Sequence, residues 1–270
     1  MKKKSNKDSL LVCQIVIMDT CPIELTQLIL EWSDFLSQIR FRCVSKNYHA
    51  RLEIHDFSYS RLSYGQRLKL SDAILQAYPF IIKLHARRGV TDVNHMTKLR
   101  ELNSSCIGND GIRNCNLAIL RVRNNSRITN INHMTNLEIL DASGECGIGD
   151  AGISKLNLVD LDACSNPRIT NVNHMTRLQK LNAQYICGID NAGIANLNLI
   201  ELHVCDNPNI TDLNYMTNLR KLGCEGENCG ISDSSIRNLK LREISAINNR
   251  KITDSDADVC AADFNLIPTE

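Results

Sequence analysis

The stretch ACSNPRITNVNHMTRLQKLNA, residues 163–183, recurs along the second two-thirds of the sequence. An upstream copy, VRNNSRITNINHMTNLEILDA, ends at Ala142, and a downstream copy, VCDNPNITDLNYMTNLRKLGC, ends at Cys224. The Ile-Thr pairs of the series are 41, 41 and 42 residues apart, and they begin at Ile128, Ile169, Ile210 and Ile252. A fixed period of this kind is typical of repeat architectures. The sequence therefore predicts a repeat protein.

Each 41-residue unit contains a second module, with copies that end at Leu158, Leu199 and Leu241. Together the two modules place a Leu-x-x-Leu core every 18 to 22 residues, at or near the range in which one repeat is a short strand plus a return segment. The cores are Leu99/Leu102, Leu117/Leu120, Leu137/Leu140, Leu158/Leu161, Leu178/Leu181, Leu199/Leu202, Leu219/Leu222 and Leu241/Ile244, and Ile81/Leu84 begins the series.

The residues after each core alternate between apolar and polar. Leu161 and Ala163 are expected to point inward and Asp162 outward, because successive side chains of a strand face opposite ways. Asn166, Asn207 and Asn249 each precede an Ile by three residues, so we expect them to bond free backbone groups of the turn in their own and the next repeat. Strands about 5 Å apart would form a curved parallel sheet in an α/β solenoid of eight or nine turns.

The return segments of the two modules differ. In the first module, apolar residues recur at every third position, which favours tight 3₁₀-like turns; one example is Ile169-Val172-Met175-Leu178. In the second module, two Ile residues lie five apart, as Ile148 and Ile153 do, and Gly152 or Gly193 directly precedes the second Ile. This spacing predicts a short α-helical turn with a close backbone approach.

The N-terminal third has a different composition, since nine of the twelve aromatic residues lie between residues 18 and 80. Pro22 and Glu24 suit a helix start, apolar residues follow at helical spacing, and a further helix is expected over Ser71–Tyr78. The domain prediction is an extension at 1–17 expected to be disordered, a helical module at 18–57, a helical linker or cap at 58–80, a solenoid at 81–254 and a tail at 255–270. Met18 is an alternative start, because the apolar run Leu10–Met18 is short for a signal peptide and no cleavage site follows it.

Residues 21–52, CPIELTQLILEWSDFLSQIRFRCVSKNYHARL, resemble an F-box, the helical motif that docks on the Skp-type adaptor of cullin–RING ubiquitin ligases. The sequence departs from the family pattern at Cys21, Ser45 and Tyr48, where Leu, Cys and Trp are usual. The resemblance implies that the adaptor would be contacted by Pro22, Ile23, Glu24, Leu25, Ile29, Leu30, Trp32, Val44 and Tyr48. The alternative is a plain helical cap that closes the end of the repeat stack.

The repeats that follow resemble the cysteine-containing class of leucine-rich repeats, a class that often follows F-boxes. The resemblance implies a cytoplasmic, non-enzymatic substrate-recognition adaptor of a Skp–cullin–F-box ubiquitin ligase, a monomer outside that complex. The alternative is a free-standing leucine-rich-repeat scaffold with no ubiquitin role. By analogy alone, such regular repeats behind an F-box also resemble proteins of large DNA viruses of amoebae, which would place the chain in host cytoplasm or nucleus.

Composition argues against two other classes of protein. Charged residues are 23% of the chain and the net charge is +1, whereas nucleic-acid and membrane-surface proteins usually carry a basic excess. No stretch reaches the 18 or so apolar residues of a membrane span. The twelve cysteines include pairs 41 residues apart, such as Cys146 and Cys187. Each therefore occupies one slot of the repeat, and free buried thiols fit a reducing compartment.

The sequence gives little support to two possible chemical sites, a metal site and a cysteine nucleophile. His95, His133 and His174 occupy one slot of every second repeat, about 10 Å apart, which is too far for shared zinc ligands at about 2 Å. A cysteine-dependent ligase using Cys260 is a third hypothesis, but no His or acidic partner stands nearby in the sequence. We therefore expect no metal and no cofactor.

The outward residues of the strands are the better candidate for function, because solenoids use such a varied concave strip to hold protein partners. An acidic patch adjoins a basic one within this strip. The predicted partner-binding residues are Arg121, Arg123, Asp141, Asp160, Asp162, Lys180, Asn182, Gln184, Glu201, His203 and Lys221.

Overall fold

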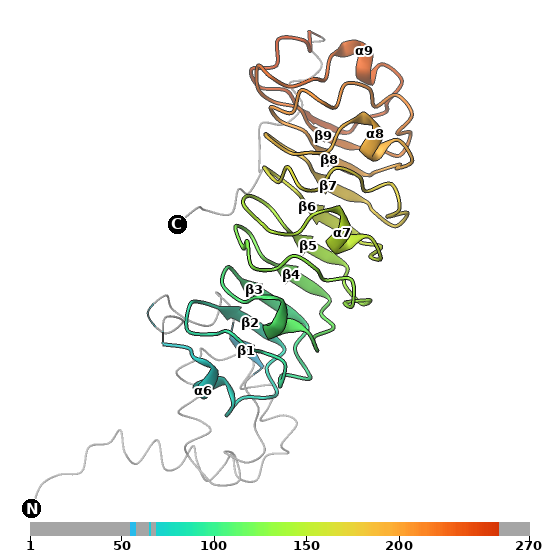
Figure 1. Ribbon diagram of the computed structural model, residues 1–270. Helices are drawn as coiled ribbons and strands as arrows, with labels where there is room; N and C mark the ends of the chain where they lie inside the picture. Colours follow the sequence, from blue (N-terminus) through green and yellow to red (C-terminus); the bar gives the residue numbers. More distant parts are fainter. Residues whose placement is uncertain (1–54, 58–64, 66–68, 254–270) are drawn as a thin grey trace, which may run out of the picture.

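The computed structural model describes residues 55–57, 65 and 69–253 (Figure 1). Most of the helical module predicted at 18–57, together with the extension at 1–17 and the tail at 255–270, lies outside these residues. The described part is a single stack of short strands that follow one another along the chain.

Ten strands form one parallel sheet in which sequence order equals spatial order. The strands are β1 (Asp56–Phe57), β2 (Lys83–Ala86), β3 (Glu101–Ser104), β4 (Ile119–Arg121), β5 (Ile139–Asp141), β6 (Asp160–Asp162), β7 (Lys180–Asn182), β8 (Glu201–His203), β9 (Lys221–Gly223) and β10 (Glu243–Ser245). The second residue of every predicted core from Leu84 to Ile244 lies in a strand, so the predicted parallel solenoid is confirmed.

The sheet starts one strand earlier than the sequence predicts. The expected series began at Ile81/Leu84, yet β1 pairs with β2 through Asp56 and Phe57. Phe57 is buried, and its ring lies 5.2 Å from that of Tyr78. An aromatic residue therefore covers the N-terminal end of the core. The sequence around Phe57 lacks the repeat motif, so this strand was not predicted.

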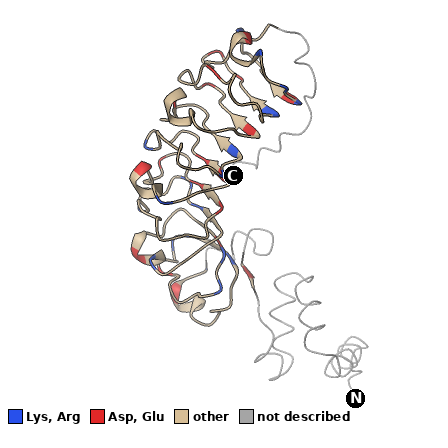
Figure 2. Cartoon of the chain, turned by 90° about the vertical axis from the view of Figure 1, so that its right-hand side faces the viewer, with Lys and Arg blue, Asp and Glu red and all other residues tan. Residues whose placement is uncertain are grey.

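Short helices return the chain between strands. They are α6 (Asp72–Leu75), the 3₁₀ helix η1 (Asn109–Ile112), α7 (Asp150–Ile153), α8 (Asn191–Ile194) and α9 (Asp233–Ile236). The last three confirm the helical turns predicted for the second module, and α6 lies inside the helix predicted at Ser71–Tyr78. Figure 2 shows the stack bending gently, with the strands on the inner side and the helices on the outer side.

Close packing explains the glycine that precedes the second Ile in this module. A Cβ on Gly193 would lie 2.1 Å from the carbonyl oxygen of Thr170 in the neighbouring repeat, which is far inside van der Waals contact. Glycine therefore allows the helix to lie against the backbone of the neighbouring repeat. In α9 the same position is Ser235, whose hydroxyl donates to the carbonyl of Thr211 at 2.6 Å.

The return segments of the first module are pairs of tight turns, as their spacing of three predicts. The amide of Met175 donates to the carbonyl of Val172 at 3.0 Å, and the amide of Leu178 donates to Met175 at 2.9 Å. Each bond spans three residues, as in a 3₁₀ helix. The apolar side chains of these turns face the core, where Val172 and Met175 are fully buried.

A buried asparagine connects each first-module turn to its neighbour. The side-chain amide of Asn166 donates to the carbonyls of Ala142 at 2.8 Å and Ile148 at 3.1 Å, and its oxygen accepts the amide of Arg168. Asn125, Asn207 and Asn249 make the same three bonds in their own repeats. The predicted bond within its own turn is confirmed by the Arg168 amide. The predicted bond to the next repeat is wrong, because the side-chain amide reaches the preceding repeat.

A second ladder fixes the Ile-Thr pairs on the outer side. The carboxylate of Asp150, at the start of α7, accepts the amide of Thr170 at 2.7 Å and also its hydroxyl. Asp72 and Asp233 hold the corresponding threonines in the same way. Asn109 and Asn191 also accept the Thr amide, but their side-chain NH2 groups donate to the Thr hydroxyl. The recurring Thr therefore ties each turn to the helix of the preceding repeat.

Replacing Asn166 by Ala should destabilise the solenoid by about 2 kcal/mol or more, because two buried carbonyls lose their partners at roughly 1 kcal/mol or more each and a partly buried amide loses a third bond. Urea unfolding of the full chain would measure the change. Asn209→Ala is the matched control, since Asn209 is exposed. Equal midpoints for the two variants would contradict the ladder's role.

Candidate functional site

The outward side chains of the strands form two rows, which we call the sheet face. Strand register places Asp160, Lys180, Glu201 and Lys221 side by side in the first row. The second row holds Arg121, Asp141, Asp162, Asn182 and His203. Arg123 and Gln184 follow two residues beyond their strands' second-row positions, so the structure brings all eleven predicted residues together on one side.

In the C-terminal half of the sheet face, opposite charges neutralise one another. Glu201 lies 3.1 Å from Lys180 and 3.1 Å from His203, and Lys221 lies 2.8 Å from Glu243. Partial burial raises the pKa of Glu201, but the hydrogen bonds from His203 and Lys180 outweigh this and lower it overall. Figure 2 shows the resulting alternation of acidic and basic strand ends.

The middle of the sheet face is acidic and makes no direct ion pairs within the described residues. Asp141, Asp160 and Asp162, which we call the acidic trio, form no salt bridge with any described residue, whereas Arg121 on the neighbouring strand pairs with Glu101. Asp141 and Asp162 are register partners on adjacent strands. Like charges placed directly opposite each other destabilise a sheet. Asp141 and Asp162 accept the amides of Ser143 and Cys164 at 3.0 and 2.9 Å, but the uncharged Asn182 accepts the amide of Gln184 in the same way. The turn therefore needs an oxygen acceptor at this position but not a negative charge.

Two members of the acidic trio, Asp160 and Asp162, have raised pKa values. Burial first, and then repulsion by Asp141, raise the pKa of Asp162 to about 6. Burial also raises the pKa of Asp160, although Lys180 opposes this. Carboxylates with raised pKa values on a concave surface are candidates for a functional role, because a bound cation would relieve the unfavourable charge.

An apolar rim borders the sheet face at the C-terminal ends of β7 and β8. Tyr185 is 48% exposed and Ile186 is 80% exposed, beside an open hollow of about 440 Å³ that Pro208 also lines. Tyr185 has φ of 58°, a conformation unusual for a bulky residue. Neither side chain was among the predicted partner-binding residues. Asn124 and Ser165 occupy the equivalent position of other repeats and also have positive φ. A bulky aromatic residue at a position that otherwise holds a small polar one was the signal in the sequence.

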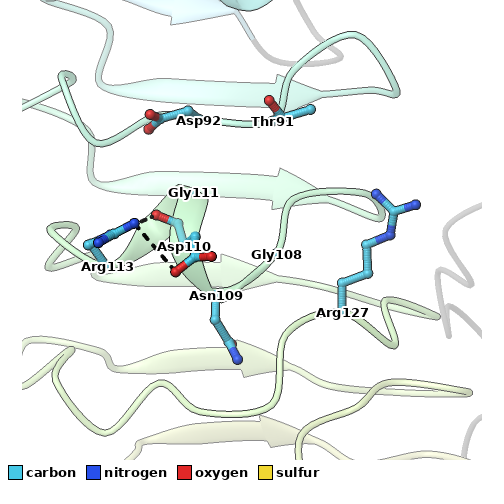
Figure 3. A pocket seen from close by; sticks show the side chains of 8 residues that line it. All are labelled: Thr91, Asp92, Gly108, Asn109, Asp110, Gly111, Arg113 and Arg127. Atoms are coloured by element: carbon cyan, nitrogen blue, oxygen red, sulfur yellow. Dashed lines mark hydrogen bonds and ion pairs between the residues drawn. The ribbon is translucent and has the colours of Figure 1, made fainter.

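A second hollow, of about 560 Å³, opens on the outer side beside η1 (Figure 3). Its polar side chains already have partners: Arg113 pairs with Asp110 at 3.4 Å, and Asn109 bonds Thr129. A Cβ on Gly111 would lie 2.0 Å from the carbonyl oxygen of Thr91. The glycine is therefore a packing requirement, and the hollow offers little to hold a ligand.

The recurring histidines have structural partners. His133 and His174 place Nε2 at 3.1 and 3.2 Å from the carbonyls of Ile112 and Ile153, which end the preceding helices. In the next copy the hydroxyl of Tyr215 donates to the corresponding carbonyl, that of Ile194, at 3.2 Å. This slot needs a hydrogen-bond donor. No cluster of potential metal ligands occurs among the residues that the structure describes.

Most of the recurring cysteines are buried, and Cys164 is partly exposed. All eight cysteines in the described ranges are free thiols, and Cys146 and Cys187 are buried in the same slot of successive units. Burial raises the pKa of Cys187 to about 11, so its sulfur is a thiol at neutral pH and a poor nucleophile. Cys260, the alternative nucleophile, lies outside the described residues.

The predicted adaptor-binding residues, from Pro22 to Tyr48, also lie outside the described residues. Within residues 55–57, 65 and 69–253, no helix has the length and apolar character needed to cross a membrane. No family model matches the chain, and no curated protein matches it.

Asp162→Asn should stabilise the protein at pH 7.5. A folded-state pKa of about 6 lies above the ordinary 3.8, so the ionised form is disfavoured on folding. Asp162 therefore has no stability penalty below pH 4 and acquires it as pH rises through 6. The gain in the variant is at most about 3 kcal/mol at pH 7.5 and vanishes near pH 4.

Urea unfolding at both pH values would measure this difference, with Asp212→Asn as the control for an exposed carboxylate. Asparagine keeps the oxygen that accepts the Cys164 amide at 2.9 Å. If the difference in unfolding free energy between the variant and the wild type does not grow with pH, the pKa of Asp162 is not raised in the folded state.

Proposed function

We propose that this chain is a non-enzymatic substrate-recognition adaptor. Residues 18–57 would bind a Skp-type adaptor of a cullin ubiquitin ligase, and the solenoid would hold a protein substrate on its sheet face. The observation that carries the proposal is the F-box-like segment at 21–52 directly before a solenoid of this kind.

The sheet face supports the second half of the proposal. The interior of the stack is filled by apolar side chains, and the polar residues of the turns and helices bond neighbouring repeats. In the acidic trio, Asp141 and Asp162 each accept the amide two residues further on, and no member forms a salt bridge with a described residue. The trio would accept a basic side chain of the substrate, and Tyr185 and Ile186 would extend the contact with an apolar rim, since exposed aromatic residues often anchor interfaces.

The alternative is a free-standing repeat scaffold in which residues 18–57 only cap the stack. The need of every solenoid for a cap favours it. Both functions use the same sheet face, so binding of the Skp-type adaptor separates them.

The purified chain should retain a recombinant Skp-type adaptor in a pull-down, and Pro22→Ala with Leu25→Ala should reduce retention at least tenfold. The control is Pro167→Ala with Ile247→Ala, which removes an exposed proline and an exposed apolar side chain of the solenoid. Failure of the wild type to bind would remove the ubiquitin-ligase proposal and leave the scaffold. In a reconstituted ligase, Cys260→Ala should leave ubiquitin transfer unchanged.

Charge reversal on the sheet face should separate substrate binding from adaptor binding. Asp160→Lys is expected to reduce capture of the substrate at least tenfold, because it places a like charge against the substrate's basic group, while the Skp-type adaptor stays bound. The Pro22/Leu25 variant should show the opposite pattern in quantitative affinity capture. Asp212→Lys, on an exposed turn, is the control. Identical captured proteins from the wild type and Asp160→Lys would contradict this assignment.

A further inference from the structure

The C-terminal end of the core is less covered than the rest. Leu199 and Leu202 are fully buried, whereas their counterparts Leu241 and Ile244 in the last described repeat are only partly buried. The same partial burial holds for Ile236, Leu239, Ala246 and Ile252. Apolar surface that is covered in every inner repeat therefore remains open beside β10.

The edge of β10 is also unpaired within the described residues. Directly after the inner strands, the amides of Val204 and Cys224 donate to the following strand, at 2.7 Å to Gly223 and 2.8 Å to Ser245. Ala246 is the next residue of this series, and its amide has no such acceptor in the part of the chain described. An edge of this kind is a template for another strand.

The sequence beyond residue 253 carries the pattern of such a strand. In the inner copy, the inward strand residues Leu181 and Ala183 lie 12 and 14 positions after Ile169. The same offsets from Ile252 reach Phe264 and Leu266. Both are apolar, and the intervening Asn265 is polar, as expected for one strand of a half-buried sheet.

The charges of the two segments are opposite. Residues 236–253 contain five Lys or Arg and one Glu, whereas residues 254–270 contain five Asp or Glu and no Lys or Arg. Register would place Asp263 beside Glu243, and the surrounding basic side chains offset this like-charge contact. The segment that follows the open end is therefore complementary to it in both charge and apolar pattern.

We propose that residues 263–266 add an eleventh parallel strand to the edge of β10, with Phe264 beside Ile244 and Leu266 beside Ala246. Nine residues would lie between Thr253 and this strand, the same number that lies between Thr211 and Lys221. Because the tail is covalently linked to β10, its effective concentration at this edge is high, and it would outcompete other chains for the edge. It is the terminal cap that a solenoid requires.

Amide hydrogen exchange of the full chain, read by mass spectrometry, tests the proposal. Phe264→Ser with Leu266→Ser should accelerate exchange at residues 243–247 at least tenfold, with strands β5–β7 as internal reference for folding. Ala261→Ser with Ala262→Ser is the matched control and should leave exchange unchanged. Equal protection of residues 243–247 in both variants would overturn the proposal.

Two further measurements distinguish the tail from a second copy of the chain at this edge. Phe264→Leu keeps an apolar side chain and should retain the protection. If a second copy covered the edge, protection would rise with protein concentration. We expect none of this dependence over a hundredfold range, and finding it would assign the edge to self-association and overturn the proposal. Adaptor binding is irrelevant to each readout, so this inference stands apart from the proposed function.

Discussion

The stack depends on an exchange of hydrogen bonds between the turns of neighbouring repeats. The parallel ladder satisfies the backbone of the strands, but it leaves carbonyls and amides in the turns that enter the core. Asn166 satisfies three of them and is itself fully buried. A buried backbone group without a partner costs about as much as a lost hydrogen bond, so removing this side chain would weaken the closure of the apolar core.

This requirement divides the surface of the molecule into two parts. On the outer side, Asp150 holds Thr170 and His174 caps α7, so exposed polar residues there are engaged in structure. On the sheet face, backbone bonds are made by the ladder, and the outward side chains are free to differ from strand to strand. A surface that varies while its scaffold stays constant is well suited to selective recognition of a partner.

Much of the fold follows from the sequence because its causes are local and repeated. The period placed the strands at Leu84 through Ile244, and the spacing of Ile189 and Ile194 predicted α8. Direction was harder: a pattern shows that Asn166 is needed in its turn, but not which neighbour its amide reaches. β1 was not predicted because Phe57 joins the sheet through contacts with Tyr78 and β2, and its surroundings lack the repeat motif.

The sequence predicted which residues lie on the sheet face, but not their burial, ion pairing or pKa values. Alternation alone placed Asp141, Asp160 and Asp162 on one side. Their burial, the absence of salt bridges to them within the described residues and the raised pKa of Asp162 depend on how closely adjacent strands pack. Tyr185 lay outside the prediction because its exposure arises from a left-handed turn, which the alternation of strand residues does not describe.

The two modules of the 41-residue unit meet through different bonds on their two sides. Asn166 and His174 of the first module reach back to the second module before them, whereas Asn132 of the first module holds Lys155 of the second module after it. Removing one repeat would place like modules together and break both sets. The smallest length by which such a chain can grow or shrink with every contact preserved is therefore a pair of repeats, so the sheet face changes in steps of two strands.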